Sequence, residues 1–368
     1  NELIFFGDNK AKIKLNILDR LNSNKKAKYI IVTAITPTPL GEGKTTTTIG
    51  LAMGLEKIGK KSVATIRQPS LGPVFGIKGC GTGGGKAKVL PVEDINLHFT
   101  GDTHSVSTAH NLCTAFLDNI LFYGNSLNID LEKILWRRVI DISDRMLRNI
   151  TVDIKQKSYS IKRNTGFDIT AASEIMAILS LSKTFADLRK KIDKIVVAFT
   201  RDKKAVFVKD LKVGGAMAVL LKDALMPNLV QSTENTPVLV HTGPFANIAH
   251  GNSSIIADTI ALRLADYVVT ESGFGADCGM EKFVNIKCRY SGLKPDCAVL
   301  VCSVRALKIH SGKIKIFSGQ PLPEELFNEN IDLIFQGLPN LQKQIENVKI
   351  YGIPVVVAIN RFDTDKEK

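Results

Sequence analysis

The stretch Tyr29–Thr48, YIIVTAITPTPLGEGKTTTT, determines the class of fold of this 368-residue chain. It begins with Ile30, Ile31 and Val32, an apolar β-branched run typical of a buried parallel strand. A loop with two prolines and two glycines follows, and after the lysine–threonine pair an apolar helical pattern starts at Ile49. Strand, glycine loop and helix in this order predict a phosphate site, because backbone N–H groups and the helix N-terminus face the anion.

The loop is a variant of the P-loop pattern G-x-x-x-x-G-K-T. The pattern places its first glycine at position 38, where this chain has Thr38. In such a loop the lysine neutralises the outer phosphates, and the threonine holds Mg²⁺ through the nucleotide phosphates. A plain strand-to-helix turn is the alternative. We expect nucleotide binding by Thr38, Pro39, Leu40, Gly41, Glu42, Gly43, Lys44 and Thr45.

The charge of the chain raises the question of a nucleic-acid partner. It carries 49 Lys and Arg against 36 Asp and Glu, a net charge of +13. An RNA-binding or partitioning ATPase would bind nucleic acid with steep salt dependence. However, the basic residues are scattered in short doublets, and the aromatic residues (7%) do not interleave with them as a stacking platform requires. We therefore expect a lysine-rich surface and no nucleic-acid partner.

The six cysteines contain no C-x-x-C pair, so neither a zinc site nor a disulfide framework is indicated. Reduced thiols favour a cytoplasmic protein.

No apolar run approaches the roughly 18 residues that span a bilayer, and the N-terminus has no signal-peptide layout. We expect no membrane partner. The chain starts at Asn1 rather than methionine and stops on charged residues, which suggests removed or interrupted ends.

Hydrophobic periodicity predicts alternating strands and helices. A second strand at residues 62–66 makes a β-α-β unit with the first, which implies a parallel sheet. The other predicted elements are helices at 2–22, 45–58, 167–181 and 214–223, and strands at 195–199, 238–240, 267–270, 298–304 and 355–359. We expect an α/β fold with a mostly parallel P-loop-type sheet flanked by helices and an inserted or second α/β lobe.

The expected division of the chain follows from these elements. Residues 1–150 would be the P-loop nucleotide-binding part of a large domain. Residues 151–235, with their lysine-rich and turn-prone start, would form the inserted, mainly α/β lobe. Residues 236–368 would complete the sheet domain and carry the substrate loops.

Basic and glycine-rich residues follow the second strand. Arg67 leaves this strand, and Lys78 precedes the run Gly79–Lys86, which has five glycines in seven residues between Gly79 and Gly85. Ligands of parallel sheets bind beyond the carboxyl ends of the strands, and such glycines let backbone amides close on an anion. We expect an acidic small molecule here, with a flexible surface loop as the alternative.

Acidic residues and histidines complete the set of candidates. Asp102 lies in a Thr-Gly-Asp turn before a helix, where it caps the helix or acts on a substrate amine. His98, His104 and His110 recur every six residues, which fits hydrogen-bonding or core roles better than a metal site. His250 shares a strand-end loop with His241, Asn247, Asn252 and Ser253, and we expect substrate contact for at least one of the two histidines.

A set of longer motifs resembles the formate–tetrahydrofolate ligase family, also called formyltetrahydrofolate synthetase, of the bacterial monofunctional type. The matches run in order from about Tyr29 to Asp365. They are TPTPLGEGKT, RQPSLGPVFGIKG, EDINLHFTGD, FDITAASEIMAIL, GPFANIAHGNSS, TESGFGAD-GMEKF, NIKCR and VRALK. This resemblance implies ATP-dependent joining of formate to N10 of tetrahydrofolate in one-carbon metabolism. The products are 10-formyltetrahydrofolate, ADP and phosphate, and the intermediate is formyl phosphate.

The resemblance also implies roles for matching residues. Lys44 would neutralise the transferring phosphates, and Thr45 would supply a ligand to Mg²⁺ on the ATP. Arg67 would hold formate and then formyl phosphate, since a planar bidentate cation suits such anions. Asp102 would contact the pterin or take a proton as N10 attacks.

Other matching positions would form the substrate side of the site. His250 and the loop with Gly273 and Gly275 would help to bind the intermediate, and Asn360 and Phe362 fall where the family places an aromatic that stacks on folate. A homotetramer and activation by a monovalent cation, potassium or ammonium, are further implications of the resemblance.

The chain departs from the family pattern in three places. Lys86 stands where the family usually has tyrosine after its glycine run, and Arg361 and Asp363 are unusual around the aromatic. The family's chains extend well beyond the position of Lys368, and this chain is expected to lack their C-terminal third. The missing part includes a tryptophan that stacks on the pterin, which Trp136 does not replace. We therefore expect an incomplete folate pocket, and a nucleotide-binding module without catalysis is the alternative function.

Overall fold

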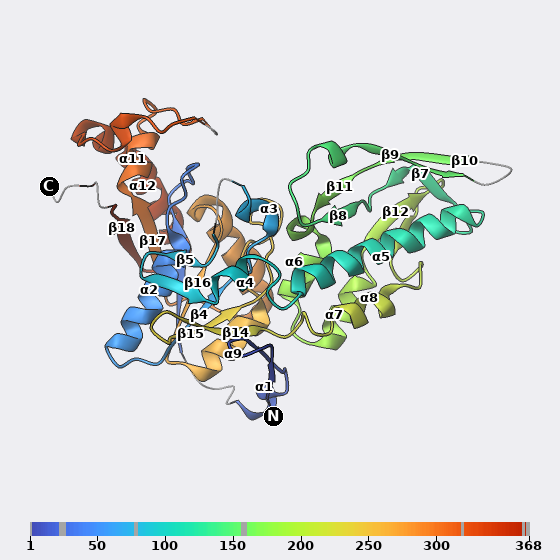
Figure 1. Ribbon diagram of the computed structural model, residues 1–368, viewed down its shortest axis with the longest axis horizontal. Coiled ribbons are helices and arrows are strands. Elements are labelled where there is room, and N and C mark those ends of the chain that lie inside the picture. Colours follow the sequence, from blue (N-terminus) through green and yellow to red (C-terminus); the bar gives the residue numbers. More distant parts are fainter. Residues whose placement is uncertain are drawn as a thin grey trace.

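The computed structural model describes residues 2–21, 27–76, 80–155, 160–317, 320–362 and 365 (Figure 1). Lys78, Gly79 and Asp363, which the sequence singled out, lie outside the described residues.

A large and mostly parallel sheet forms the body of the protein, as predicted. Its six parallel strands, in spatial order, are β15 (Pro237–Val240), β4 (Ser62–Ile66), β16 (Tyr267–Glu271), β3 (Lys28–Ala34), β17 (Cys297–Ser303) and β18 (Val355–Asn360). An antiparallel edge continues beyond β15 with β14 (Asn228–Ser232), β2 (Ala11–Ile13) and β1 (Leu3–Phe5). The strand that precedes the phosphate loop, β3, thus lies inside the sheet.

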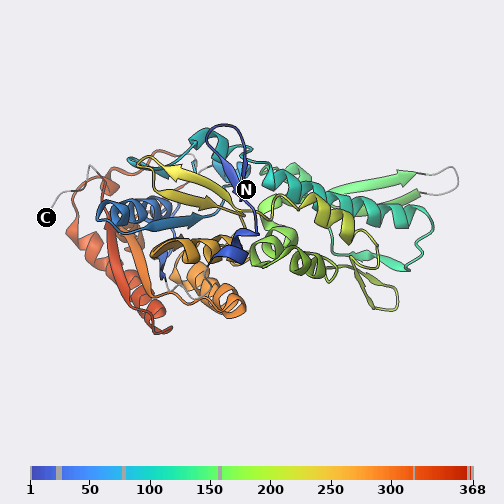
Figure 2. The same ribbon diagram turned by 90° about the horizontal axis from the view of Figure 1, so that it is seen from below.

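Helices cover both faces of this sheet because its strands are apolar on both sides. Along β4, Ala64 and Ile66 face the cluster that includes residues of α2 (Lys44–Lys57), whereas Val63 faces the cluster with residues of α9 (Ile255–Leu264). Figure 2 shows the blue helix α2 and the orange helical elements, which include α9, on different sides of the strands. The helices α11 (Val304–His310) and α12 (Ile331–Lys349) pack against each other beside β17 and β18.

A second lobe, defined here as the elements from residue 102 to residue 220, extends away from the sheet (Figure 1). Among the described residues, its strands pair only with one another. Its helices are α5 (Asp102–Phe122), α6 (Glu174–Leu181), α7 (Phe185–Ile192) and α8 (Gly214–Leu220). Its strand sets are β7 (Ile129–Ile134) with β12 (Val196–Thr200) and β13 (Ala205–Phe207), β8 (Arg138–Ile140) with β11 (Phe167–Ile169), and β9 (Ile150–Lys155) with β10 (Ser160–Thr165). The expected boundaries at 150 and 235 stay predictions.

Short elements complete these two parts. They are α1 (Ile17–Arg20), α3 (Leu71–Val74), β5 (Gly83–Gly84), β6 (Ala87–Leu90), α4 (Val92–Asn96), α10 (Arg289–Ser291), the 3₁₀ helices Met146–Arg148, Thr170–Ala172 and Glu324–Leu326, and the π-helices η3 (Ala276–Met280) and η4 (Phe283–Cys288). Of these, β6 pairs with β14 and β5 in the large sheet.

Three predicted helices differ from the structure. Residues 2–22 form two strands and one helical turn, because Ala11 and Ile13 alternate with Lys12 and β2 gains hydrogen bonds from the distant strand β14. The run 167–181 starts as β11, which pairs with β8, and becomes α-helical only at Glu174. The helix that begins at Gly214 ends at Leu220 rather than residue 223.

Candidate functional site

The predicted phosphate loop and several of the other predicted residues come together at one edge of the sheet. Since the six strands are parallel, their carboxyl ends meet at this edge. The loop after β3 carries Lys44, Arg67 follows β4, Glu271 ends β16, and Asn360 ends β18. The sequence predicted Lys44 and Arg67 as site residues, whereas Glu271 appeared only within the motif TESGFGAD.

The phosphate loop is fixed by two left-handed glycines and one buried carboxylate. Gly41 and Gly43 have φ values of 76° and 82°, which favour glycine. A Cβ at Gly43 would also lie 2.6 Å from Asn360 Nδ2, which donates a hydrogen bond to the Glu42 carbonyl at 3.2 Å. Lys44 is the first residue of α2. This arrangement presents the N-terminus of a 14-residue helix at the end of the loop.

The buried Glu42 side chain binds the loop at Thr38, the position where the P-loop pattern has its first glycine. Its Oε1 accepts hydrogen bonds from both the N–H and the hydroxyl of Thr38, each at 2.9 Å, and its Oε2 accepts from Ser303 Oγ at 3.2 Å. Threonine at position 38 therefore closes the loop with its hydroxyl, which a glycine lacks.

The second residue of α2 contacts the neighbouring strand. Thr45 Oγ1 donates a hydrogen bond to Glu271 Oε2 at 2.7 Å. Glu271 is only 5% exposed. A hydroxyl has one hydrogen to donate and two lone pairs, so this bond leaves the lone pairs of Thr45 for a cation.

Arg67 lies on the other side of Glu271. Its Nη1 donates to the Pro244 carbonyl at 3.1 Å, while its Nε is buried without a hydrogen-bond partner among the described residues. Burial lowers the pKa of the guanidinium, and the nearby Glu271 carboxylate opposes that change. A buried donor without a partner is costly in a folded protein, and an anionic ligand would satisfy it.

The glycine loop after β16 approaches Arg67 closely. A Cβ at Gly273 would lie 2.7 Å from Ala246 Cβ and 3.1 Å from Arg67 Nη2. At Gly275 a Cβ would lie 2.9 Å from the Ile35 carbonyl. Both positions require glycine for reasons of space, and the π-helix η3 begins directly after them. Such π-helical turns are frequent at functional sites.

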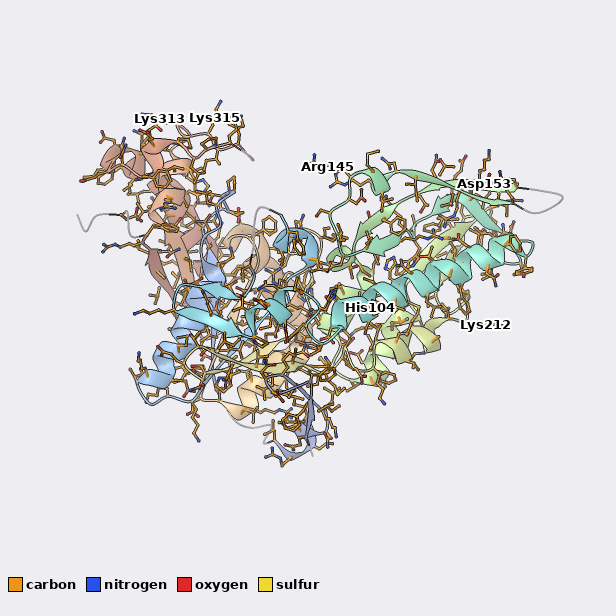
Figure 3. The ribbon with its side chains drawn as sticks, in the orientation of Figure 1. His104, Arg145, Asp153, Lys212, Lys313 and Lys315 are labelled. Carbon is orange, nitrogen blue, oxygen red and sulfur yellow. The ribbon has the colours of Figure 1, made fainter. Side chains whose placement is uncertain are left out.

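A cavity of about 1340 Å³ opens from Arg67 toward the second lobe. Three further arginines line it: Arg137, Arg145 and Arg148. Figure 3 shows Arg145 at the end of the second lobe that is nearer to the sheet. The rest of the lining comes from α3, the loops at 245–248 and 273–274, and the lobe residues 142–144, 149, 167–169 and 172. Two carboxylates, Asp144 and Asp168, also line the cavity, and Asp168 pairs with Arg137 at 3.3 Å. The remaining excess of positive charge favours an anionic ligand.

Asp102 lies outside the lining of this cavity. It is the first residue of α5, and its side chain does not cap the helix. Instead, the carboxylate accepts from Lys12 Nζ at 2.7 Å and from Asn228 Nδ2 at 2.7 Å. The capping interpretation is therefore wrong, and the substrate role stays a prediction.

The histidines that the sequence singled out as functional are buried. His250 lies 2.7 Å from Ser180 Oγ, and burial together with the positive charges of Lys287, Arg67 and Lys282 lowers its pKa to about 3. It is therefore neutral at physiological pH, where it contributes polarity but no charge.

His241 and His110 share one arrangement. The Nε2 of His241 donates to the Ala224 carbonyl at 2.8 Å, and its Nδ1 lies 2.6 Å from the hydroxyl of Ser254, the N-cap of α9. Equivalent contacts join His110 to the Arg137 carbonyl and to Ser173, the N-cap of α6. Burial lowers the pKa to about 3 for His241 and about 4 for His110. Both histidines connect helix starts to the core, as the sequence suggested for His110.

The family model for formate–tetrahydrofolate ligase matches residues 1–368. The formate–tetrahydrofolate ligase of Roseiflexus sp. strain RS-1 is 58% identical over 360 residues. The enzyme of that name from Saccharopolyspora erythraea is 56% identical over 360 residues, and that from Desulforamulus reducens is 55% identical over 369 residues. The chain belongs to the formate–tetrahydrofolate ligase family.

This chain spans somewhat less than two thirds of its relatives in the formate–tetrahydrofolate ligase family. The matches cover 98%, 98% and 100% of the chain but 64%, 64% and 65% of the three relatives, in the order Roseiflexus, Saccharopolyspora and Desulforamulus. None of the helices in the described ranges combines the length and hydropathy that crossing a bilayer requires.

The aromatic that the family resemblance assigned to folate stacking lies at the same edge of the sheet. The Arg305 guanidinium carbon is 3.8 Å from the centroid of the Phe362 ring and 5.0 Å from that of Phe327. Phe362 follows Asn360, which contacts the phosphate loop. An arginine stacked on an aromatic ring holds the ring in place.

The donor set near the phosphate loop fits Mg²⁺ that arrives with a nucleotide. Among the residues that the structure describes, no three His, Cys, Asp or Glu side chains form a group that could hold a metal by themselves. Mg²⁺ usually keeps waters and binds through one or two carboxylates and substrate phosphates. The Thr45 hydroxyl with its Glu271 partner provides this kind of partial set.

Proposed function

We propose that this protein ligates formate to tetrahydrofolate in an ATP-dependent reaction, giving 10-formyltetrahydrofolate, ADP and phosphate. The observation that carries this proposal is the position of Arg67. Its guanidinium, with one buried donor unsatisfied, lies between the Glu271 carboxylate beside the phosphate loop and a large cavity lined by arginines. This is a suitable place for a small anion to meet a terminal phosphate.

In the proposed first step, a formate oxygen attacks the γ-phosphorus of ATP, and the bond to ADP breaks. Lys44 neutralises the phosphate oxygens, and Arg67 binds formate and orients it toward the phosphorus. Mg²⁺ on the nucleotide, held by Thr45, would supply further neutralisation of charge. Positioning and charge neutralisation provide most of the catalysis in phosphoryl transfer.

In the proposed second step, N10 of tetrahydrofolate attacks the formyl carbon of formyl phosphate, the carbon–oxygen bond to phosphate breaks, and the proton of N10 passes to the departing phosphate. The backbone of the loop with Gly273 and Gly275 faces Arg67 and would bind the phosphate of the intermediate together with it. Neutral His250 would contribute polarity next to this loop. Phe362 would stack on the pterin, and a contact between Asp102 and the pterin remains part of the proposal.

Several properties of the whole protein belong to the proposal as well. They are the cytoplasmic location, the homotetramer, the activation by potassium or ammonium and the absence of nucleic-acid and membrane partners. All six cysteines are free, which agrees with a reducing compartment.

A nucleotide-binding module without ligase activity is the second candidate for this chain. The observation in its favour is the coverage of 64–65% of the relatives' length, since residues outside that part would complete a folate pocket. The phosphate loop, Arg67 and Glu271 all lie within the chain.

One experiment distinguishes the two functions. The chain is incubated with MgATP, formate and tetrahydrofolate, and ADP and 10-formyltetrahydrofolate are measured with each substrate omitted in turn. Calorimetry with MgADP accompanies the assay. Product that requires all three substrates supports the ligase. Nucleotide binding without product supports the module, and absence of nucleotide binding by the folded chain contradicts both.

A further inference from the structure

A second cavity, called the amino-edge cavity here, lies at the other edge of the sheet from Arg67. Its volume is about 820 Å³. Its lining includes Tyr29, near the start of β3, and Asp296, directly before β17, so it lies at the amino ends of the parallel strands. It shares no lining residue with the cavity at Arg67. An occupant of this cavity is therefore separate from the chemistry at the carboxyl edge.

The floor of the amino-edge cavity is apolar and belongs to the main hydrophobic core. Ile255 and Ile256 at the start of α9 are 3% and 1% exposed. Leu18 of α1, Leu262 of α9 and Leu293 are partly buried against the same core (Figure 1). Ligand pockets measure about 300–1,000 Å³ and are mostly apolar, with a few polar groups that orient the ligand. The size and the floor therefore suit an organic molecule with an apolar body.

Three cationic side chains line the same cavity: Lys183, Arg263 and Lys294. The Nη1 of Arg263 donates to the Leu18 carbonyl at 3.0 Å, and the Nζ of Lys183 donates to the Tyr290 carbonyl at 3.1 Å. Lys294 forms no ion pair within the described part of the chain. Since arginine carries five N–H donors and lysine three, these contacts leave donors for an anion.

The acidic residue in the described lining already has partners. Asp296 Oδ1 accepts from Lys28 Nζ at 3.0 Å, and its Oδ2 accepts from the Tyr29 N–H at 2.8 Å. Its charge is thus neutralised by a lysine outside the lining, so the three cations of the lining keep their excess positive charge. Such an excess attracts an anion.

The cations of this cavity come from both parts of the molecule. Lys183 lies between α6 and α7 of the second lobe, whereas Arg263 and Lys294 belong to the sheet body. An anion that bonds to Lys183 and to either of the other two therefore joins the lobe to the body at this edge.

We propose that the amino-edge cavity is a binding site for a small organic anion, with an aromatic or branched apolar body and one acidic group. The body packs on the apolar floor, and the acidic group bonds to Lys183, Arg263 and Lys294. The site does not depend on the proposed nucleotide and formate site, so either proposal can fail without the other.

The test is a fluorescence titration of the 368-residue chain with anilinonaphthalene sulfonate. N-phenylnaphthylamine, which has the same aromatic body but no charge, is the matched probe. The variant Lys183→Gln with Lys294→Gln removes two charges from the cavity. The control variant, Lys313→Gln with Lys315→Gln, removes the same charge near α11 (Figure 3). Thr259→Trp fills the cavity from α9.

We expect the sulfonate to bind at one site and more tightly than the uncharged probe. Its affinity should fall about tenfold when the two cavity lysines are changed, because charge-assisted hydrogen bonds are lost. The control variant should bind like the unaltered chain, and Thr259→Trp should abolish binding. Circular dichroism checks each fold, and the lysine variants, altered only at exposed side chains, provide the test if Thr259→Trp does not fold.

Three results would overturn the inference. Equal affinity for both probes would show that the charge is not recognised. Unchanged affinity after the two lysine substitutions would place the sulfonate elsewhere on the protein. Displacement of the sulfonate by MgADP would place it at the phosphate loop.

Discussion

Lys12 Nζ lies 2.7 Å from Asp102 Oδ1, and both side chains are buried. The pair joins strand β2 near the N-terminus to the start of α5, and Asn228 of β14 donates to the other carboxylate oxygen. Breaking a buried ion pair leaves one uncompensated charge, which costs more than the intact pair contributes.

Replacing one partner of this pair should therefore destabilise the fold strongly. We expect Lys12→Met to lower the free energy of unfolding by about 3–5 kcal/mol. The double variant Lys12→Met with Asp102→Asn should be more stable than the sum of the single changes predicts. Urea denaturation of the four proteins of this cycle measures the coupling. Additive effects would show that the pair is not formed in solution.

Acidification should destabilise the protein through its buried histidines. Burial lowers the pKa of His110 to about 4 and the pKa values of His241 and His250 to about 3, from an ordinary value of 6.5. Between the folded and unfolded pKa values the unfolded state binds more protons, so the free energy of unfolding falls as pH falls below about 6.5. Each histidine should contribute about 1–2 kcal/mol of loss between pH 7 and pH 5.

Urea midpoints at several pH values between 7 and 5 measure this slope. His110→Gln should flatten it, whereas the same substitution at the exposed His104 should leave it unchanged. An equal slope in all three proteins would assign the acid sensitivity to other groups.

Arg67→Ala should separate the anion function from nucleotide binding. The change removes the guanidinium that faces the cavity but leaves the phosphate loop intact. We expect formate-dependent ADP formation to fall by about 10²–10³-fold, the usual cost of removing one transition-state donor. Binding of MgADP, measured by calorimetry, should change little. Loss of MgADP binding would instead place Arg67 on the nucleotide.

The cysteines should differ widely in their rate of alkylation. Cys80 is exposed, whereas burial raises the pKa values of Cys113, Cys288 and Cys302 to about 12. At pH 8 only about one in ten thousand of such buried thiols is ionised, and the thiolate is the reactive form. Mass spectrometry after iodoacetamide treatment should find Cys80 modified first. Early modification of Cys113 would indicate local opening of α5.

Sequence periodicity was sufficient for the strands that hold the site. The parallel strands and α2 lie within a few residues of their predicted bounds, because each is an apolar run with a clear turn or glycine after it. The sequence alone therefore predicts that the residues after these strands, including Lys44 and Arg67, lie at one edge of the sheet.

Other features depend on partners far away in the chain. Residues 2–22 were predicted to be helical, but β2 forms because β14, more than 200 residues later, supplies its hydrogen bonds. Nothing in the sequence marks Lys12 as buried, because lysine is rarely buried without a partner and the partner Asp102 lies 90 residues further along. Glu271 could have been singled out from the sequence as an acidic residue at the end of an apolar strand. Its hydrogen bond to Thr45 could not be predicted, because it depends on β16 lying next to β3 in the sheet.

The outer strand β18 has a practical consequence for handling this protein. Among the strands of the described residues it is the last in the sheet order, and Val356 and Ile359 are 58% and 64% exposed, with Phe335 of the adjacent helix 65% exposed. Open ladder groups beside apolar side chains favour pairing between molecules. Concentrated solutions of this chain should therefore self-associate through β18, and replacing Val356 by lysine should reduce their light scattering.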